Sequence, residues 1–162
     1  MKTLIVVVLA LSTAGLVACS ASSPSTPDTS AYGQVASDVS AAAQAHRAAS
    51  ASFATEADCI GERDRYDGRV APLLERMRGM SGGMDACSDS MGHHETPTMS
   101  DTCDSMRSEL TRHMAAACAS ANAEGQMAEV NTHADRMTQW AKTERDRSGR
   151  MGGMMGGGGC HM

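Results

Sequence analysis

Apolar residues recur at intervals of three and four positions between residues 32 and 150, which is the spacing of one face of an α-helix. Four stretches carry this pattern. Their inward positions are Val35, Val39, Ala42, His46, Ala49 and Phe53; Cys59, Glu62, Tyr66, Val70, Leu73 and Met77; Met99, Cys103, Met106, Leu110, His113 and Ala117; and Met127, Val130, His133, Met137, Trp140 and Glu144. Polar residues that favour helix N-caps, Thr55 and Asn122, interrupt the pattern. The helical spacing of the four stretches therefore predicts an all-α protein.

The two halves of this region resemble each other. Shifting the sequence by 67 residues places 46–49 (His-Arg-Ala-Ala) on 113–116 (His-Met-Ala-Ala) and Glu62 on Glu129, with no gap. Each copy reads as a helical hairpin, and two hairpins form a four-helix bundle. The repeat thus predicts an up-down-up-down bundle over 32–150, with hairpins 32–79 and 98–150 joined by a loop over 80–97.

The N-terminal segment has the features of an export signal: a basic start, an apolar run too short to span a bilayer, and a cysteine. The sequence Leu16-Val17-Ala18-Cys19 resembles the lipobox of bacterial lipoproteins. That resemblance implies a signal peptide over 1–18 and lipid on Cys19. Ser20 in the next position favours the outer membrane, facing the periplasm. The Ser/Pro/Thr-rich stretch 19–31 is expected to be a disordered tether between membrane and bundle.

Composition narrows the function classes. The net charge of −5 provides no basic stripe for a nucleic-acid partner. No Gly-rich phosphate loop, nucleophile elbow or His-Glu-x-x-His motif occurs, so we expect no enzymatic activity. The chain is instead rich in metal-binding residue types, with 14 Met, 6 His and 6 Cys in 162 residues.

Many of these residues gather in the predicted loop over 80–97 and in a Gly/Met-rich tail over 151–162, which we expect to be disordered. The candidate ligands there are Met80, Met84, Met91, His93, His94, Met151, Met154, Met155, Cys160, His161 and Met162. Thioether, thiol and imidazole groups suit soft or borderline ions such as copper or zinc. Covalent haem is excluded, because Cys160-His161 lacks the required cysteine at position 157, which is Gly157.

A second candidate site lies in the predicted bundle interior. His46 precedes the first turn by about as many residues as Glu62 follows it, so the two reach similar depth. The second copy repeats this arrangement, and the whole set is His46, Glu62, Tyr66, His113, Glu129 and His133. These residues either bind a metal or form buried His–Glu hydrogen bonds that fix helix register. The spacing differs from the Glu-x-x-His of ferritin-like di-metal bundles, so a ferroxidase site is not expected.

The positions of the cysteines relative to the turns predict two disulfides. Cys59 and Cys118 each lie four residues from a hairpin turn at the same end of the bundle, so we expect them to pair. Cys87 and Cys103 lie near the opposite end and are expected to pair there. Alternatively, Cys59, Cys103 and Cys118 stay reduced as ligands of Cu(I).

Two functions remain open. One is an envelope lipoprotein that binds copper or a similar ion for sequestration or buffering, which resembles Met/His-rich envelope metal-handling proteins in composition only. The other is a disulfide-stapled structural or interaction module anchored at the membrane, with no metal role. A protein partner is not specified by the sequence.

Overall fold

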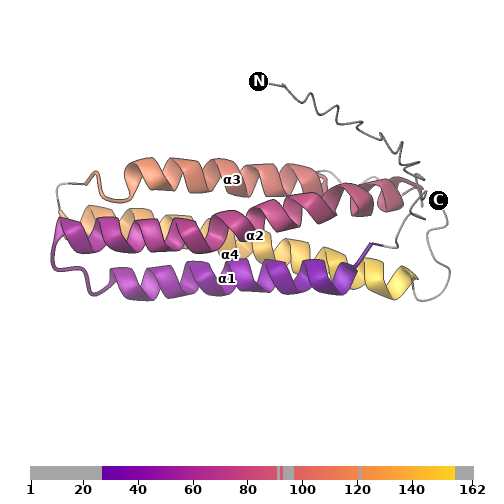
Figure 1. Ribbon diagram of the computed structural model, residues 1–162, viewed down its shortest axis with the longest axis horizontal. Coiled ribbons are helices and arrows are strands. Elements are labelled where there is room, and N and C mark those ends of the chain that lie inside the picture. The colour runs from indigo at the N-terminus through magenta and orange to yellow at the C-terminus, as the bar shows by residue number, and fades with distance from the viewer. Residues whose placement is uncertain (1–26, 91, 93–96, 121, 156–162) are drawn as a thin grey trace, which may run out of the picture.

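The computed structural model describes residues 27–90, 92, 97–120 and 122–155, and this part of the chain contains four α-helices and no strand (Figure 1). They are α1 (Thr29–Ser50), α2 (Glu56–Ser90), α3 (Met99–Ala116) and α4 (Ala123–Met155). Each helix packs against two others, in the cyclic order α1, α2, α3, α4. The predicted all-α, up-down-up-down bundle is confirmed. The predicted signal peptide and residues 19–26 of the predicted tether lie outside the described residues. Residues 29–31 were also assigned to the tether, and this is wrong, because they form the start of α1.

Polar caps define where the helices begin. Thr55 Oγ1 accepts from the Asp58 amide at 3.1 Å, and the Asp58 carboxylate accepts from the Thr55 amide at 2.9 Å. Thr98 and Asp101 form the same reciprocal capping box at the start of α3. Asn122 Oδ1 accepts from the Gly125 amide at 2.8 Å ahead of α4. The predicted breaks at Thr55 and Asn122 are therefore confirmed.

Helix α2 is longer than predicted. It continues through the glycine-rich segment after residue 79 as far as Ser90, so the predicted loop is wrong for residues 80–90. The physical reason is that buried positions keep their helical spacing at Met77, Ser81, Met84 and Cys87. Burial of this face outweighs the cost of helical glycines, about 1 kcal/mol each relative to alanine.

Helix α4 also extends past its predicted end at residue 150, to Met155, so the tail begins later than expected. Close contact with α1 explains this. A Cβ at Gly152 would lie 2.9 Å from Thr29 Oγ1, and one at Gly33 would lie 2.8 Å from Ser148 Oγ. Glycines at these two positions let the helices approach each other more closely than side chains would permit.

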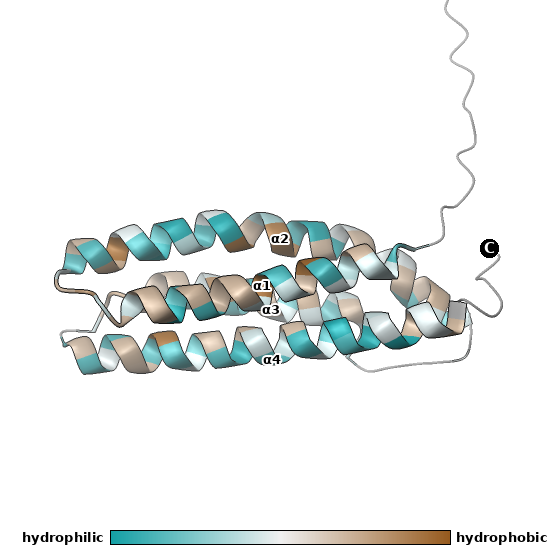
Figure 2. Ribbon diagram, turned by 90° about the horizontal axis from the view of Figure 1, so that it is seen from below, coloured by the Kyte–Doolittle hydropathy of each residue, from teal (hydrophilic) through white to brown (hydrophobic). Residues whose placement is uncertain are grey.

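The core consists mainly of small and sulfur-containing side chains, and hydrophobic patches alternate with hydrophilic ones along every helix (Figure 2). Most predicted inward positions are buried. In α2 the buried leucine is Leu74, whereas Leu73 is only partly buried, and Trp140 of α4 is also only partly buried. None of the described helices is long and apolar enough to cross a membrane.

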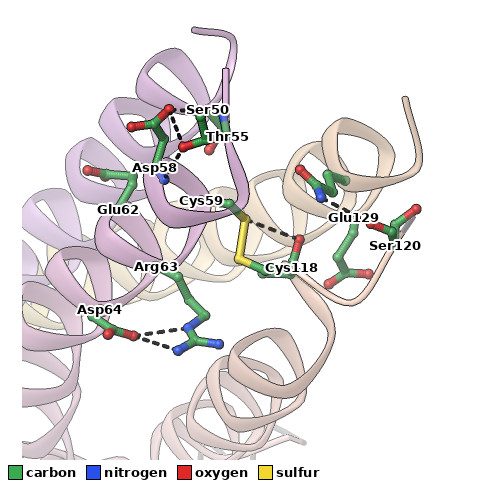
Figure 3. Close-up of a disulfide and its surroundings, with 12 residues drawn as sticks. Ser50, Thr55, Asp58, Cys59, Glu62, Arg63, Asp64, Cys118, Ser120 and Glu129 are labelled. Atoms are coloured by element: carbon green, nitrogen blue, oxygen red, sulfur yellow. Dashed lines mark hydrogen bonds and ion pairs between the residues drawn. A yellow bond between two sulfur atoms is a disulfide. The ribbon is translucent and has the colours of Figure 1, made fainter. Parts of the chain in front are cut away.

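The disulfide between Cys59 and Cys118 is confirmed, with the two Cα atoms 6.0 Å apart (Figure 3). It ties the first turn of α2 to the turn that precedes α4. The predicted Cys87–Cys103 bond is wrong: Cys87 is disulfide-bonded, but Cys103 is a buried free thiol. Cys103 faces the core, where its sulfur lies 3.5 Å from the Tyr32 hydroxyl, and Cys87 belongs to α2 rather than to a loop.

Candidate metal centre

Four aromatic rings, one from each helix, meet inside the bundle, and we call them the histidine cluster. They are His46, Tyr66, His113 and His133, and none is more than 1% exposed. His46 stacks on Tyr66 with ring centroids 4.3 Å apart, and His113 stacks on His133 at 3.9 Å. The two stacks meet edge to face. The structure thus brings together the rings that the sequence assigned to one depth of the bundle.

Two contacts join the stacks, and both link residues 67 positions apart, which is the offset of the sequence repeat. His46 Nε2 and His113 Nε2 are 3.1 Å apart. The Tyr66 hydroxyl lies 2.9 Å from His133 Nε2. Burial raises the pKa of Tyr66, so its hydroxyl stays protonated and donates a hydrogen bond to His133 Nε2. Both contacts therefore join residues that occupy equivalent positions in the two copies of the repeat.

Each histidine contacts a different carboxylate through its other ring nitrogen, Nδ1. The Nδ1-to-oxygen distances are 3.4 Å from His46 to Glu62, 3.2 Å from His113 to Glu129, and 3.1 Å from His133 to Glu109. Carboxylates in this position orient metal-ligating histidines and raise their basicity in many proteins. Glu109 was missed by the sequence reasoning.

Arginines keep these carboxylates ionised. Burial alone would raise the pKa of Glu109, but hydrogen bonds from Arg112, His133 and Arg136 outweigh it and lower the pKa to about 2. Arg112 also contacts Glu129 at 2.8 Å. All three carboxylates of the cluster are consequently anionic near neutral pH, because the same balance operates at the other two.

At Glu62, burial again favours the neutral acid, but Arg65, His46 and Arg69 lower the pKa overall. Arg65 Nε lies 3.0 Å and Arg69 Nη2 2.8 Å from the carboxylate. At Glu129, Arg112 and a histidine have the same effect. An ionised carboxylate only accepts hydrogen bonds, so the Nδ1 atom of each histidine must donate.

This assignment leaves His46 and His113 with an unusual contact. A neutral imidazole carries one hydrogen, and here it sits on Nδ1, so both Nε2 atoms present bare lone pairs. These lone pairs face each other across 3.1 Å. A hydrogen bond between them would require a second proton on one ring. Burial opposes this: it lowers the pKa of His113, and together with His113 it lowers the pKa of His46 to about 4. The contact is suited to a cation other than a proton.

A separate group of buried polar side chains, which we call the tyrosine cluster, lies nearer the end of the bundle opposite the two hairpin turns. It comprises Tyr32, Cys103 and Glu144, with Arg147 at its edge. The Tyr32 hydroxyl donates to Glu144 Oε2 at 2.8 Å, and Arg147 donates to Glu144 Oε1 at 2.9 Å. Burial raises the pKa of Glu144 despite these contacts, and it raises the pKa of the Cys103 thiol to about 11.

The ligands predicted for the loop and tail are distributed differently. Met80 and Met84 belong to α2, Met84 is fully buried, and Met80 is partly buried. Met151 packs against the core, and Met154 is 48% exposed. Outside the described residues, or without a described side chain, are Met91, His93, His94, Met155, Cys160, His161 and Met162.

In the described ranges, no three His, Cys, Asp or Glu side chains surround a common metal position. The histidine cluster offers two nitrogens 3.1 Å apart, and the Tyr66 ring stacks on one of the two rings. Comparison with known protein families, curated proteins and solved structures returned no match. The site must therefore be interpreted from its own chemistry.

Proposed function

We propose that the protein binds a metal ion between His46 and His113. The observation that carries the proposal is the pair of Nε2 atoms 3.1 Å apart, each on a ring whose Nδ1 is committed to an anionic carboxylate. A cation that accepts both lone pairs removes their mutual repulsion. Glu62 and Glu129 keep the hydrogen of each ring on Nδ1 and fix the ring orientation, so both Nε2 atoms stay available to the ion.

Imidazole nitrogen suits copper and zinc best among common ions. With metal–nitrogen distances of about 2.0–2.1 Å, a nitrogen separation of 3.1 Å corresponds to an angle of roughly 100° at the metal. This lies between square-planar and tetrahedral geometry. The Tyr66 hydroxyl oxygen is a candidate for a further position, because its ring stacks on His46.

The proposed setting is the bacterial envelope, with the bundle attached to the outer membrane through lipid on Cys19. The lipobox-like sequence supports this. In that setting the bundle sequesters or buffers the ion. Replacing Cys19 with Ala is expected to give soluble or unprocessed protein, whereas normally processed, membrane-bound material would contradict the lipoprotein assignment.

A structural module is the second candidate. Its support is that, among described residues and apart from the His46–His113 contact, Arg47 Nε is the one buried side-chain nitrogen or oxygen without a hydrogen-bond partner. Such nearly complete pairing is typical of a network that fixes helix register. The Cys59–Cys118 bond adds to this candidate, because it links the two hairpins covalently.

Metal binding by the chelator-treated protein distinguishes the two functions. We expect Cu(II) or Zn(II) to bind with one equivalent per chain, to raise the melting temperature, and to be lost in His46→Ala. For Cu(II), the electron paramagnetic resonance spectrum should show coupling to two nitrogens. Tyr32→Phe is the matched control, because it alters the tyrosine cluster and leaves the histidines intact.

Circular dichroism should verify that both variants remain helical. Binding that is equally strong in folded His46→Ala, or no binding by the unsubstituted chain, would favour the structural module.

A further inference from the structure

Residues of α2, α3 and α4 line a pocket. It lies at the end of the bundle opposite the hairpin turns, where α2 and α4 end (Figure 1). It contains about 570 Å³ of space not filled by atoms, part of it open to solvent. Four methionines line it, and we call it the methionine pocket: Met84 from α2, Met99 from α3, and Met151 and Met154 from α4. Three helices thus contribute methionine side chains to one pocket.

These methionines lie far apart in the sequence, so the sequence did not indicate that they line one pocket. Met84 belongs to the segment predicted to be a loop, and Met151 and Met154 belong to the predicted tail. The extension of α2 to Ser90 and of α4 to Met155 brings the two segments to the same end of the bundle. Met84 from the first segment and Met151 and Met154 from the second therefore line one pocket.

Core packing accounts for only part of this group. Methionine often fills irregular interiors, and Met77, Met106 and Met137 do so here, since each is fully buried in the core. Met84 and Met99 are buried in the same core cluster and Met151 packs against it, but all three also line the pocket. Met154 is 48% exposed, although exposure of a large apolar side chain brings no packing energy. A ligand for the sulfur atoms gives Met154 a role that burial does not.

The chemistry of the lining selects the ligand. Thioether sulfur is a soft, uncharged donor, which favours monovalent Cu(I) and its analogue Ag(I) over zinc and hard ions. Asp85 and Asp89 also line the pocket, opposite Arg147 and Arg150. The formal charges of these four side chains cancel, so a singly charged ion meets less electrostatic opposition than a doubly charged one would.

We propose that the methionine pocket is a second metal site, which binds one Cu(I) or Ag(I) ion through Met84, Met99, Met151 and Met154. It is independent of the proposed site between His46 and His113, since it uses different ligands at a different position and selects a softer ion. No change of oxidation state is involved in binding.

Silver titration of the purified chain with ¹³C-labelled methionine methyl groups tests the proposal. Ag(I) is diamagnetic and does not change oxidation state under these conditions, so each of the 14 methionines can be followed by NMR. We expect the methyl signals of the four pocket methionines to shift together and to saturate at one equivalent. Changing all four to Leu preserves volume, removes sulfur, and should abolish that equivalent.

The matched control changes Met77, Met106 and Met137 to Leu, which removes as many core thioethers as possible without touching the pocket. This control and His46→Ala should both retain the silver site. Saturable shifts confined to Met77, Met106 or Met137, no shift at one equivalent, or undiminished silver binding at one equivalent by the folded four-Leu variant would each overturn the proposal. Loss of divalent-ion binding in His46→Ala with silver binding intact would show that the two sites are separate.

Discussion

The two hairpins place the same His–Glu pair at the same depth, but the ring that stacks beside it differs. In the first hairpin Tyr66 stacks on His46, whereas in the second His133 stacks on His113. A tyrosine has one polar atom to satisfy and a histidine has two. This single difference changes what the surrounding helices must provide.

Glu109 provides the additional acceptor. It accepts from His133 Nδ1 at 3.1 Å, and the position 67 residues earlier is Ala42, which has no polar side chain. Arg112 and Arg136 in turn hold the added carboxylate. The comparison teaches that a buried polar substitution in a duplicated scaffold persists only with its own hydrogen-bonding partners.

The largest effect is expected from Glu109→Ala. It leaves His133 Nδ1 and two arginines without their shared acceptor, and loss of one partner of a buried ionic network costs about 3–5 kcal/mol. The free energy of unfolding in urea measures this. Adding His133→Tyr recreates the Ala and Tyr pair of the first hairpin and should recover part of the loss. Strictly additive losses in this double-mutant cycle would contradict the interpretation.

The second effect tests the covalent link between the hairpins. Replacing Cys59 and Cys118 with Ala removes a bond between residues 59 positions apart. The expected destabilisation is about 2–4 kcal/mol, because the unfolded chain regains freedom. Cys103→Ser is the control, since it alters a buried thiol without a disulfide. A melting temperature unchanged by reduction of the disulfide would contradict this role.

The third prediction uses the symmetry of the proposed divalent site. His46→Ala and His113→Ala should weaken Cu(II) or Zn(II) binding by similar factors, since each contributes one Nε2 atom. A ligand at 100 times its dissociation constant stabilises a fold by about 2.7 kcal/mol, and both variants should lose this increment. His133→Tyr should retain it, because both ligands remain. Loss in only one of the two Ala variants would rule out the shared site.

The sequence was sufficient for the parts of the fold that depend on periodicity and repetition. Helical spacing and the caps at Thr55 and Asn122 located the two hairpin turns, and the repeat brought His46 and His113 to one depth. The end of α2 was missed because a glycine-rich segment resembles a loop, although Met84 and Cys87 continue the buried face. Local composition carried less information there than the spacing of those buried residues.

The candidate site was only partly predictable for a related reason. The repeat identifies residue pairs that occur in both copies. It gives no information about a polar residue that occurs in one copy only. Glu109 lies one turn before His113 in α3 but was not among the predicted inward positions. The available signal was that His133 stands where the first copy has Tyr66, because a histidine needs one more hydrogen-bond partner than a tyrosine. The tyrosine cluster joins Tyr32 to Glu144 across 112 residues outside the repeat relation, so no sequence pattern indicated it.

The smallest effect concerns that cluster, where the copies differ again: Glu144 falls on Met77 and Tyr32 on Met99 at the same offset. Burial raises the pKa of Glu144 above its unfolded value, while Tyr32, Thr102 and Arg147 offset part of the rise. The stability that this shift contributes is present below the unfolded pKa and is lost as pH rises through the folded one.

Glu144→Gln cannot ionise and keeps an oxygen that accepts from Tyr32. Its stability relative to the unsubstituted chain should therefore become more favourable as the pH rises from about 4.5 to 8. The change amounts to about 1.4 kcal/mol for each unit by which folding raises the pKa. Loss of the Arg147 contact lowers the whole curve, whereas the slope comes from the ionisation of Glu144. Urea midpoints at four pH values measure the slope.

Tyr32→Phe removes a hydrogen-bond donor to the Glu144 carboxylate and so raises the pKa of Glu144 further. The stability of this variant should therefore fall more steeply with rising pH than that of the unsubstituted chain. Parallel curves for Glu144→Gln and the unsubstituted chain would mean that Glu144 titrates alike in the folded and unfolded states, and that the second hairpin holds this carboxylate without strain.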